Sequence, residues 1–309
     1  MEWKKEGVVF SADNDFEWMV SHASLPFAYK KSEDYYRIFI STRNSYGQSF
    51  PAYVDYDFKN KKIIKVSQKP LLNLGKPGTF DDNGIMFSSM VEDKDKIYMY
   101  YIGWNMEVKV SYKLSIGLAI SKDGGETFEK YSEGPIMDRS VDEPYFNTAP
   151  CVIKENDLWR MWYVSCTGWI KSEGKMEPIY YVRSAESKDG INWVRKKEPA
   201  INYNSDHEAI GRPWVIKYKG IYRMWYSSRN TVDYRNNKNN TYKIGYAESE
   251  DGNKWIRKDN QVGLGISNDG WDSLMTCYCS VFEEENKLFM LYNGNGFGKS
   301  GTGMAICNE

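Results

Sequence analysis

Residues 158–165 read LWRMWYVS and residues 221–228 read IYRMWYSS, so one aromatic pattern occurs twice in this chain. Weaker copies stand at residues 36–41 (YRIFIS), 97–101 (IYMYY) and 288–292 (LFMLY). Aligned on the last aromatic position, four tyrosines stand 62, 63 and 66 residues apart, namely Tyr101, Tyr163, Tyr226 and Tyr292. A nearly constant spacing of this length predicts a repeat architecture.

The repeats have the character of β-strands. Aromatic residues make up 16% of the 309-residue chain, the apolar runs are short, and a sustained helical period is almost absent. Each repeat offers an apolar strand, the aromatic strand, a third strand after a variable loop, and a fourth after a tight turn. The repeats span residues 18–74, 81–137, 142–202, 206–262 and 270–307.

The tight turn is a second recurring signature. It reads SKDGGETF at residues 121–128, SKDGINW at 187–193 and SEDGNKW at 249–255. Asp-Gly favours a hairpin, because glycine tolerates positive φ and aspartate bonds to the turn backbone. One active site does not need three equivalent aspartates, so we interpret these residues as structural.

The last repeat has only three predicted strands, and residues 7–11 form a strand outside any repeat. We therefore predict one all-β domain over residues 1–309. It is a five-bladed β-propeller with four antiparallel strands per blade, and its ring is closed by the N-terminal strand joining the last blade. Such closure leaves only short, protected sheet edges.

The composition limits the partners and the cellular location that we expect. The chain has 41 basic and 42 acidic residues, which gives no overall reason to expect nucleic acid or an anionic membrane as partner. It offers neither a signal-peptide pattern near Met1 nor an apolar stretch long enough to span a bilayer. Its five cysteines lack a CxxC pair and predict buried free thiols. We expect a cytoplasmic protein and leave its oligomeric state open.

The chain resembles the five-bladed β-propeller superfamily of glycoside hydrolases, which includes arabinanase/xylosidase-like, invertase-like and mannoside-phosphorylase-like families. The resemblance covers nearly the whole chain. It rests on the blade count, the aromatic strands and the turns at residues 119–128, 185–193 and 247–255. The first turn also fits the Asp-box of sialidase-type propellers. Where the superfamily carries an acidic Glu-Gly-Pro motif, this chain reads Gly211-Arg212-Pro213.

The resemblance implies a pocket on the propeller axis, where carboxylates from separate blades converge. Acidic residues do precede four inner strands here, and the candidates are Asp82, Glu143, Glu208 and Asp272. Glycosidic cleavage needs one carboxylic acid and a second carboxylate. We assign Asp82 as base, Glu208 as acid and Glu143 as the orienting residue, with Asp272 as a substitute. The alternative is that these acids cap loops or form ion pairs.

Other residue types form a second set of candidates for substrate binding. Arg43, Arg212 and Arg229 offer bidentate donors suited to carboxylate or phosphate, or else they pair with the acids and hold the blades together. His22 and His207, the chain's two histidines, precede inner strands, and Trp104 and Trp169 follow aromatic strands as candidate stacking platforms for a sugar. We assign no cofactor and no metal ligand, although a divalent cation on the axis stays open.

Taken together, these features favour a carbohydrate-active enzyme that cleaves a glycosidic bond by carboxylate acid/base chemistry. One alternative is a glycosyl-transferring or phosphorolytic enzyme that binds a phosphate or nucleotide-sugar through arginines. Another is a non-catalytic, glycan-binding propeller. The expected partner is a carbohydrate, and an anionic or phosphorylated carbohydrate stays open as an alternative.

Overall fold

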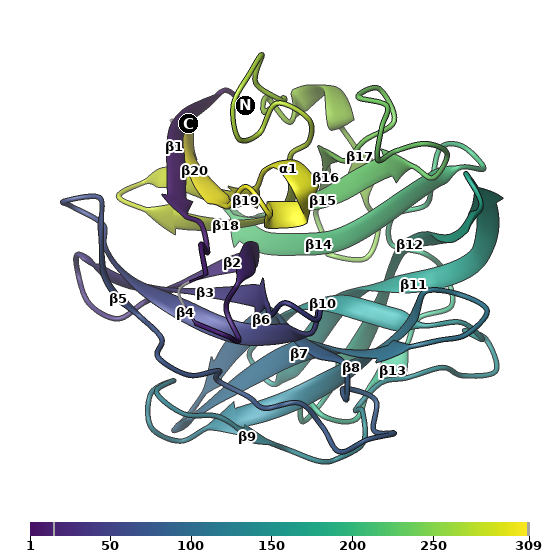
Figure 1. Cartoon of the computed structure of the whole chain (residues 1–309), viewed down its shortest axis with the longest axis horizontal. Coiled ribbons are helices and arrows are strands. Elements are labelled where there is room, and N and C mark those ends of the chain that lie inside the picture. Colours follow the sequence, from purple (N-terminus) through teal and green to yellow (C-terminus); the bar gives the residue numbers. More distant parts are fainter. Residues whose placement is uncertain (15, 308–309) are drawn as a thin grey trace.

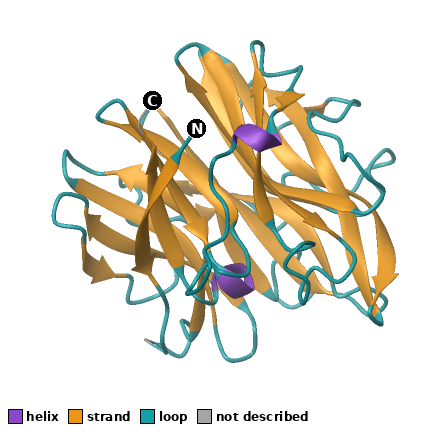
Figure 2. Ribbon diagram, turned by 90° about the horizontal axis from the view of Figure 1, so that it is seen from above, coloured by secondary structure: helices purple, strands orange, loops and turns teal. Residues whose placement is uncertain are grey.

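The computed structural model describes residues 1–14 and 16–307, and nearly all of them belong to strands or the turns between strands (Figures 1 and 2). Helix is confined to the 3-10 turn η1 (Asp259–Gln261) and the short α1 (Asn295–Gly298). No helix in this part of the chain is long and apolar enough to cross a membrane. The prediction of an all-β chain is confirmed.

The strands form consecutive antiparallel groups of four. The first group is β2 (Ser21–Lys30), β3 (Tyr35–Arg43), β4 (Ser49–Asp57) and β5 (Lys62–Val66). The second is β6 (Gly84–Asp93), β7 (Lys96–Met106), β8 (Tyr112–Ser121) and β9 (Glu129–Lys130). A single parallel pair, Ser49 with Gly84, joins these two groups into one larger sheet.

Two more groups follow the same order. They are β10 (Asn147–Glu155), β11 (Leu158–Ser172), β12 (Lys175–Ser187) and β13 (Val194–Arg195), and then β14 (Glu208–Tyr218), β15 (Ile221–Asn230), β16 (Lys243–Ser249) and β17 (Ile256–Arg257). The aromatic stretch of residues 158–165 lies in β11, the second strand of its group. Its large side chains, such as Trp162 and Tyr163, are buried.

The last group contains both ends of the described chain. It has β18 (Cys277–Glu284), β19 (Lys287–Asn293) and β20 (Thr302–Cys307), and its fourth strand is β1 (Trp3–Phe10), which pairs antiparallel with β20. The predicted N-terminal strand therefore joins this group, and it begins earlier than the expected residues 7–11. Hydrogen bonding leaves every sheet open.

The first strands of the groups pack against one another in sequence. Strand β2 contacts β6, β6 contacts β10, β10 contacts β14, β14 contacts β18, and β18 contacts β2. The predicted hairpin turns are also present, since the Asp189 carboxylate accepts hydrogen bonds from the Ile191 and Asn192 amides at 2.9 and 2.8 Å. The five first strands thus surround a common centre, and this arrangement positions the site.

Candidate functional site

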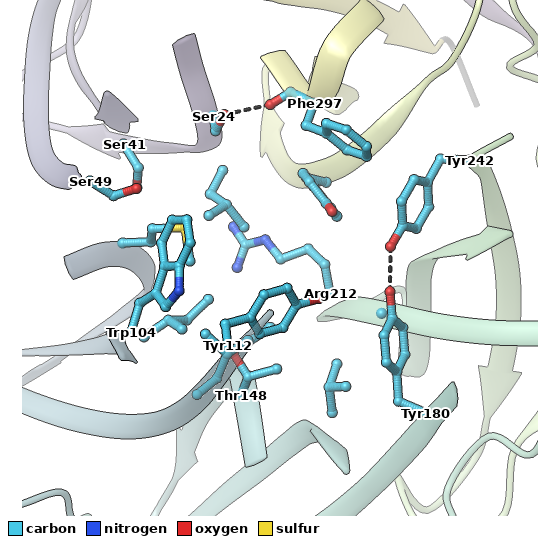
Figure 3. A pocket seen from close by; sticks show the side chains of 18 of the residues that line it. Ser24, Ser41, Ser49, Trp104, Tyr112, Thr148, Tyr180, Arg212, Tyr242 and Phe297 are labelled. Atoms are coloured by element: carbon cyan, nitrogen blue, oxygen red, sulfur yellow. Dashed lines mark hydrogen bonds between the residues drawn. The ribbon is translucent and has the colours of Figure 1, made fainter. Parts of the chain in front are cut away.

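A cavity of about 320 Å³ lies among the five first strands, and residues from β2, β6, β10, β14 and β18 all line it (Figure 3). Its volume falls within the range of small-molecule sites, ~300–1,000 Å³. Its wall is largely aromatic and aliphatic, with contributions from Trp104, Tyr112, Phe146 and Tyr180. The cavity can therefore enclose a ligand of about one or two rings.

Several residues that line this cavity have an unusual backbone conformation. Four of its lining residues lie in the left-handed region although none is glycine, with φ of 54° at Leu25, 47° at Ala149, 49° at Arg212 and 53° at Tyr278. Each lies at or beside a shift in strand register. Bulges re-aim side chains and are frequent beside active sites, and such backbone strain persists only where the surrounding structure enforces it.

Arg212 is the charged residue among these four, and its side chain is only 1% exposed. Figure 3 shows its guanidinium in the middle of the cavity wall. Nη1 donates to the carbonyl of Ser88 at 2.6 Å and to the Ser88 hydroxyl at 3.2 Å. Nε and Nη2 have no hydrogen-bond partner among the described residues. Burial lowers the pKa of Arg212 to about 10, so it stays charged at neutral pH.

Arg37 shows what the same guanidinium edge does elsewhere in this chain. Its Nε and Nη2 donate to the two carboxylate oxygens of Asp55 at 2.8 and 3.1 Å. This bidentate arrangement suits planar carboxylates and phosphates. In Arg212 the equivalent edge is unpaired. The cavity lining thus includes a guanidinium edge with two donors that have no partner among the described residues.

Arg229 lies beside a cluster of buried tyrosines. Its Nε donates to the Tyr242 hydroxyl at 3.1 Å and its Nη2 to the Pro178 carbonyl at 3.1 Å, while Nη1 has no partner in the described chain. Its guanidinium stands 3.9 Å from the Tyr234 ring centre, and the Tyr180 and Tyr242 hydroxyls share a hydrogen bond. The rings offset part of the penalty for burying this cation.

Among the described residues, the rest of the lining adds further hydrogen-bonding atoms without a partner and no carboxylate. Buried side-chain atoms without a partner include Ser49 Oγ, Trp104 Nε1 and Thr148 Oγ1. Arg43 stands 5.4 Å from the Trp104 ring, and no acid of the described residues lies within ion-pair distance of it. The site is rich in donors and positive in charge.

The predicted carboxylates lie elsewhere, and two of them serve a recurring structural contact. Glu143 accepts from Tyr163 at 3.0 Å and pairs with Arg195 at 2.7 Å. Asp272 accepts from Tyr292 at 2.9 Å and pairs with Lys5 at 2.6 Å. In each case the acid joins the second strand of its group to the fourth.

Two other groups repeat this contact. Asp81 accepts from Tyr101 at 3.0 Å and pairs with Lys130 at 2.7 Å. In the fourth group the acid is Asp259, which binds Tyr226 and Arg257. The tyrosines that set the sequence period are therefore the donors of a tyrosine–carboxylate–cation contact. We call it the blade clamp, and the sequence did not predict it.

Asp82 and Glu208 are also engaged outside the cavity. Asp82 accepts from the Gly78 amide and the Asn105 side chain, both at 2.8 Å. Glu208 lines a separate polar cavity of about 370 Å³ and binds Arg257 at 2.7 Å. Burial opposes ionisation of Glu208, but hydrogen bonds from Arg257 and its neighbours outweigh burial and lower the pKa. The catalytic assignments of all four carboxylates stay predictions.

The predicted arginines and one predicted tryptophan line the cavity, whereas the other tryptophan and both histidines lie outside its lining. Trp104 lines the cavity, as do the three predicted arginines, whereas Trp169 packs behind it against Tyr112 and Phe146. His22 hydrogen-bonds to the Ser21 hydroxyl, and burial, aided by Arg43, lowers its pKa to about 4. His207 is exposed. Neither histidine belongs to the lining, and within the described residues no three His, Cys, Asp or Glu side chains are grouped to hold a metal.

Comparison with known proteins agrees with this architecture. Residues 68–208 match the glycosyl hydrolases family 32 N-terminal domain. A solved structure described as a glycoside hydrolase is 18% identical, with a TM-score of 0.75 over 98% of this chain and 90% of that one. A structure from the GH130 family of mannoside phosphorylases is 16% identical, with a TM-score of 0.69 over 99% of this chain and 93% of that one. These similarities show that the chain has the fold of these glycoside hydrolases and that part of it matches a glycosyl hydrolase family model.

A curated protein with higher sequence identity is also similar to this chain. The uncharacterized protein Rv1502 of Mycobacterium tuberculosis (strain ATCC 25618 / H37Rv) is 36% identical over 308 residues, which cover 99% of both chains. The chain belongs to the same family as Rv1502. The resemblance to glycoside hydrolases seen in the sequence is supported by the family-model match and by the solved structures.

Proposed function

We propose that this protein is a carbohydrate-active enzyme whose central cavity binds a sugar that carries an anionic group, such as a phosphate, a nucleotide diphosphate or a carboxylate. The superfamily supports a carbohydrate ligand. The aromatic wall offers faces on which a sugar ring can stack. The unpaired guanidinium edge of Arg212 supplies a site for the anion.

The free edge of Arg212 carries this proposal. Burying a charge costs free energy unless the charge is paired and hydrogen-bonded. Arg212 is fully buried, its Nε and Nη2 are unpaired, and the cavity lining holds no carboxylate to neutralise it. An anionic ligand would complete the same bidentate geometry that Asp55 gives to Arg37.

Thermal unfolding with a panel of ligands tests the proposal. Glucose, glucuronate, glucose 1-phosphate and UDP-glucose would be compared at one ionic strength, with inorganic phosphate as a further probe. We expect at least one anionic sugar to raise the Tm and glucose to leave it unchanged. Arg212→Gln should remove the shift, while the exposed Arg139→Gln should keep it. Equal stabilisation by neutral and anionic sugars would contradict the proposal.

Glycosidic cleavage through carboxylates is the second candidate reaction, favoured by the match to family 32. It would use Asp82 as base and Glu208 as acid, and it requires these residues to leave their present partners and reach a sugar. Turnover of aryl glycosides and oligosaccharides by Asp82→Asn and Glu208→Gln checks this assignment. Unchanged turnover in both variants would exclude it.

Binding without turnover is favoured by one observation, since Glu143 and Glu208 are paired with arginines as in a structural role. Tight binding of an anionic sugar with no product over a broad panel of glycans and acceptors would support this alternative. Phosphate-dependent cleavage would instead identify a phosphorolytic enzyme.

The five groups of strands are, in this proposal, the blades of one five-bladed propeller over residues 1–309. Support comes from the successive contacts among the first strands and from the pairing of β1 with β20. The ring would then be held by the strand that brings the two ends of the chain together.

A further inference from the structure

The arginines of the cavity lie at different depths. Arg212 and Arg229 are buried, Arg43 is partly exposed, and the side chain of Arg235 is 43% exposed. All four line the same cavity. Arg229 is held by Tyr242 and the Pro178 carbonyl, so we define the floor by the buried Arg212 and the mouth by the more exposed Arg43 and Arg235.

The floor is an enclosed environment. Arg212 is bound by Ser88 of β6, and its guanidinium stands 5.2 Å from the ring of Trp214. The ionisable groups that act on it are the buried thiols Cys151 and Cys279. Nε and Nη2 of Arg212 are themselves buried, so an anion can reach them only if the adjacent lining side chains move.

The mouth has its own unbalanced charge. Burial lowers the pKa of Arg43, and the neighbouring positive charge of Arg235 lowers it further. Arg235 is tied to Glu177 at 3.2 Å, and the Tyr234 hydroxyl also donates to Glu177 at 3.1 Å. Arg43 has no such acid, so the pair at the mouth keeps a net positive charge that a second anion would offset.

We propose that the cavity is bipartite and takes a sugar with two anionic groups, one bound by the Nε and Nη2 edge of Arg212 at the floor and the other by Arg43 and Arg235 at the mouth. This inference rests on the proposed function and deepens it. Arg43 stands 5.4 Å from the Trp104 ring, whereas the guanidinium of Arg212 stands 5.2 Å from the Trp214 ring and binds Ser88. The two guanidiniums thus occupy separate surroundings.

The cavity lining offers aromatic faces for a sugar ring. Tyr112 and Phe146 line the cavity and stand 6.0 Å apart between ring centres, and Trp104 lies 6.1 Å from Tyr112. Aromatic faces of this kind stack on the apolar face of a sugar. A phosphate carries close to two negative charges and three acceptor oxygens, which suits the free donors at each end. A sugar bisphosphate matches this distribution of charge.

Isothermal titration calorimetry with four probes tests the inference. The probes are glucose, glucose 1-phosphate, glucose 6-phosphate and glucose 1,6-bisphosphate at constant ionic strength. We expect the bisphosphate to bind at least about tenfold more tightly than either monophosphate, because a second charge-assisted contact is made. Arg43→Gln should bring the bisphosphate to within about threefold of the better monophosphate. Arg139→Gln, an exposed arginine outside the cavity lining, should change neither value.

The outcomes separate the two proposals. If a monophosphate binds and the bisphosphate binds no more tightly, the bipartite site is wrong and the proposed function stands. The same conclusion follows if Arg43→Gln weakens monophosphate and bisphosphate equally. If none of the three phosphates and no other anionic sugar of the panel binds, both proposals are wrong. Arg43→Gln alters a partly exposed side chain, so the test does not depend on the folding of an Arg212 variant.

Discussion

Replacing Arg212 with methionine is expected to stabilise the ligand-free protein while it abolishes anion binding. Burial lowers the pKa of Arg212 from 12.5 to about 10. That difference corresponds to a penalty of roughly 3 kcal/mol on the charged form. Losing the two hydrogen bonds to Ser88 offsets ~1–2 kcal/mol of the relief. An apolar side chain at this position should therefore raise the free energy of unfolding by about 1–2 kcal/mol.

Arg37→Met is the matched control. Arg37 is also buried, but its Nε and Nη2 atoms already donate hydrogen bonds to a carboxylate. Its partner Asp55 is buried and accepts from both Nε and Nη2. Removing one partner of a buried ion pair costs about 3–5 kcal/mol, since the other charge is left uncompensated. The same substitution should thus act in opposite directions at the two sites.

Urea unfolding followed by tryptophan fluorescence measures both variants, and the 11 tryptophans of the chain give a strong signal. The transition midpoints and slopes would be compared with those of the unaltered protein at pH 7. If Arg212→Met is destabilised as much as Arg37→Met, then Arg212 is a satisfied structural residue. The interpretation of its free edge as a ligand site would be refuted.

Three further predictions concern the scaffold. Tyr163→Phe should lower the free energy of unfolding by about 1–2 kcal/mol in urea titrations, because buried Glu143 loses a donor; no loss would remove the blade clamp from the stabilising contacts. Glu208 has a lowered pKa in the folded protein, so it contributes stability above pH 4.5 that is lost as pH falls through the folded pKa. Acid titrations of Glu208→Gln should therefore show a flatter loss of stability below pH 4.5, and an unchanged profile would contradict the shift. Gly190→Ala should lower the Tm, because φ is 73° there and the added Cβ would lie 2.8 Å from the Tyr100 hydroxyl, whereas an unchanged Tm would show that the turn adapts.

The strand order could be predicted well from the sequence because large side chains that are buried recur at the same position in each repeat. Trp162 and Trp225 occupy equivalent places in β11 and β15, and their burial requires the same partners in each group. The role of the period tyrosines could not be found this way. Spacing shows that Tyr163 recurs, but the acid it binds, Glu143, lies 20 residues away across a turn whose path is set by tertiary packing.

The candidate site was predicted only in part for a similar reason. Position before an inner strand suggested that Glu143 and Asp272 face the axis, yet each turns to the cation of its own fourth strand. Arg212 faces the cavity because its backbone adopts a bulge with positive φ, and no propensity rule forecasts arginine in that conformation. The departure from the acidic motif at Gly211-Arg212-Pro213 was the available signal.

Three separate penalties meet at Arg212, and their coincidence is the strongest reason to regard the cavity as functional. Its left-handed backbone is strained, its charge is buried, and two of its nitrogens lack partners. Each penalty alone is found in proteins, but local rules are broken together chiefly where a function compensates for the loss. Arginines with a structural role in this fold are paired with carboxylates instead, as Arg37 is with Asp55 and Arg195 with Glu143. This combination of penalties is the reason for our proposal that Arg212 binds an anion.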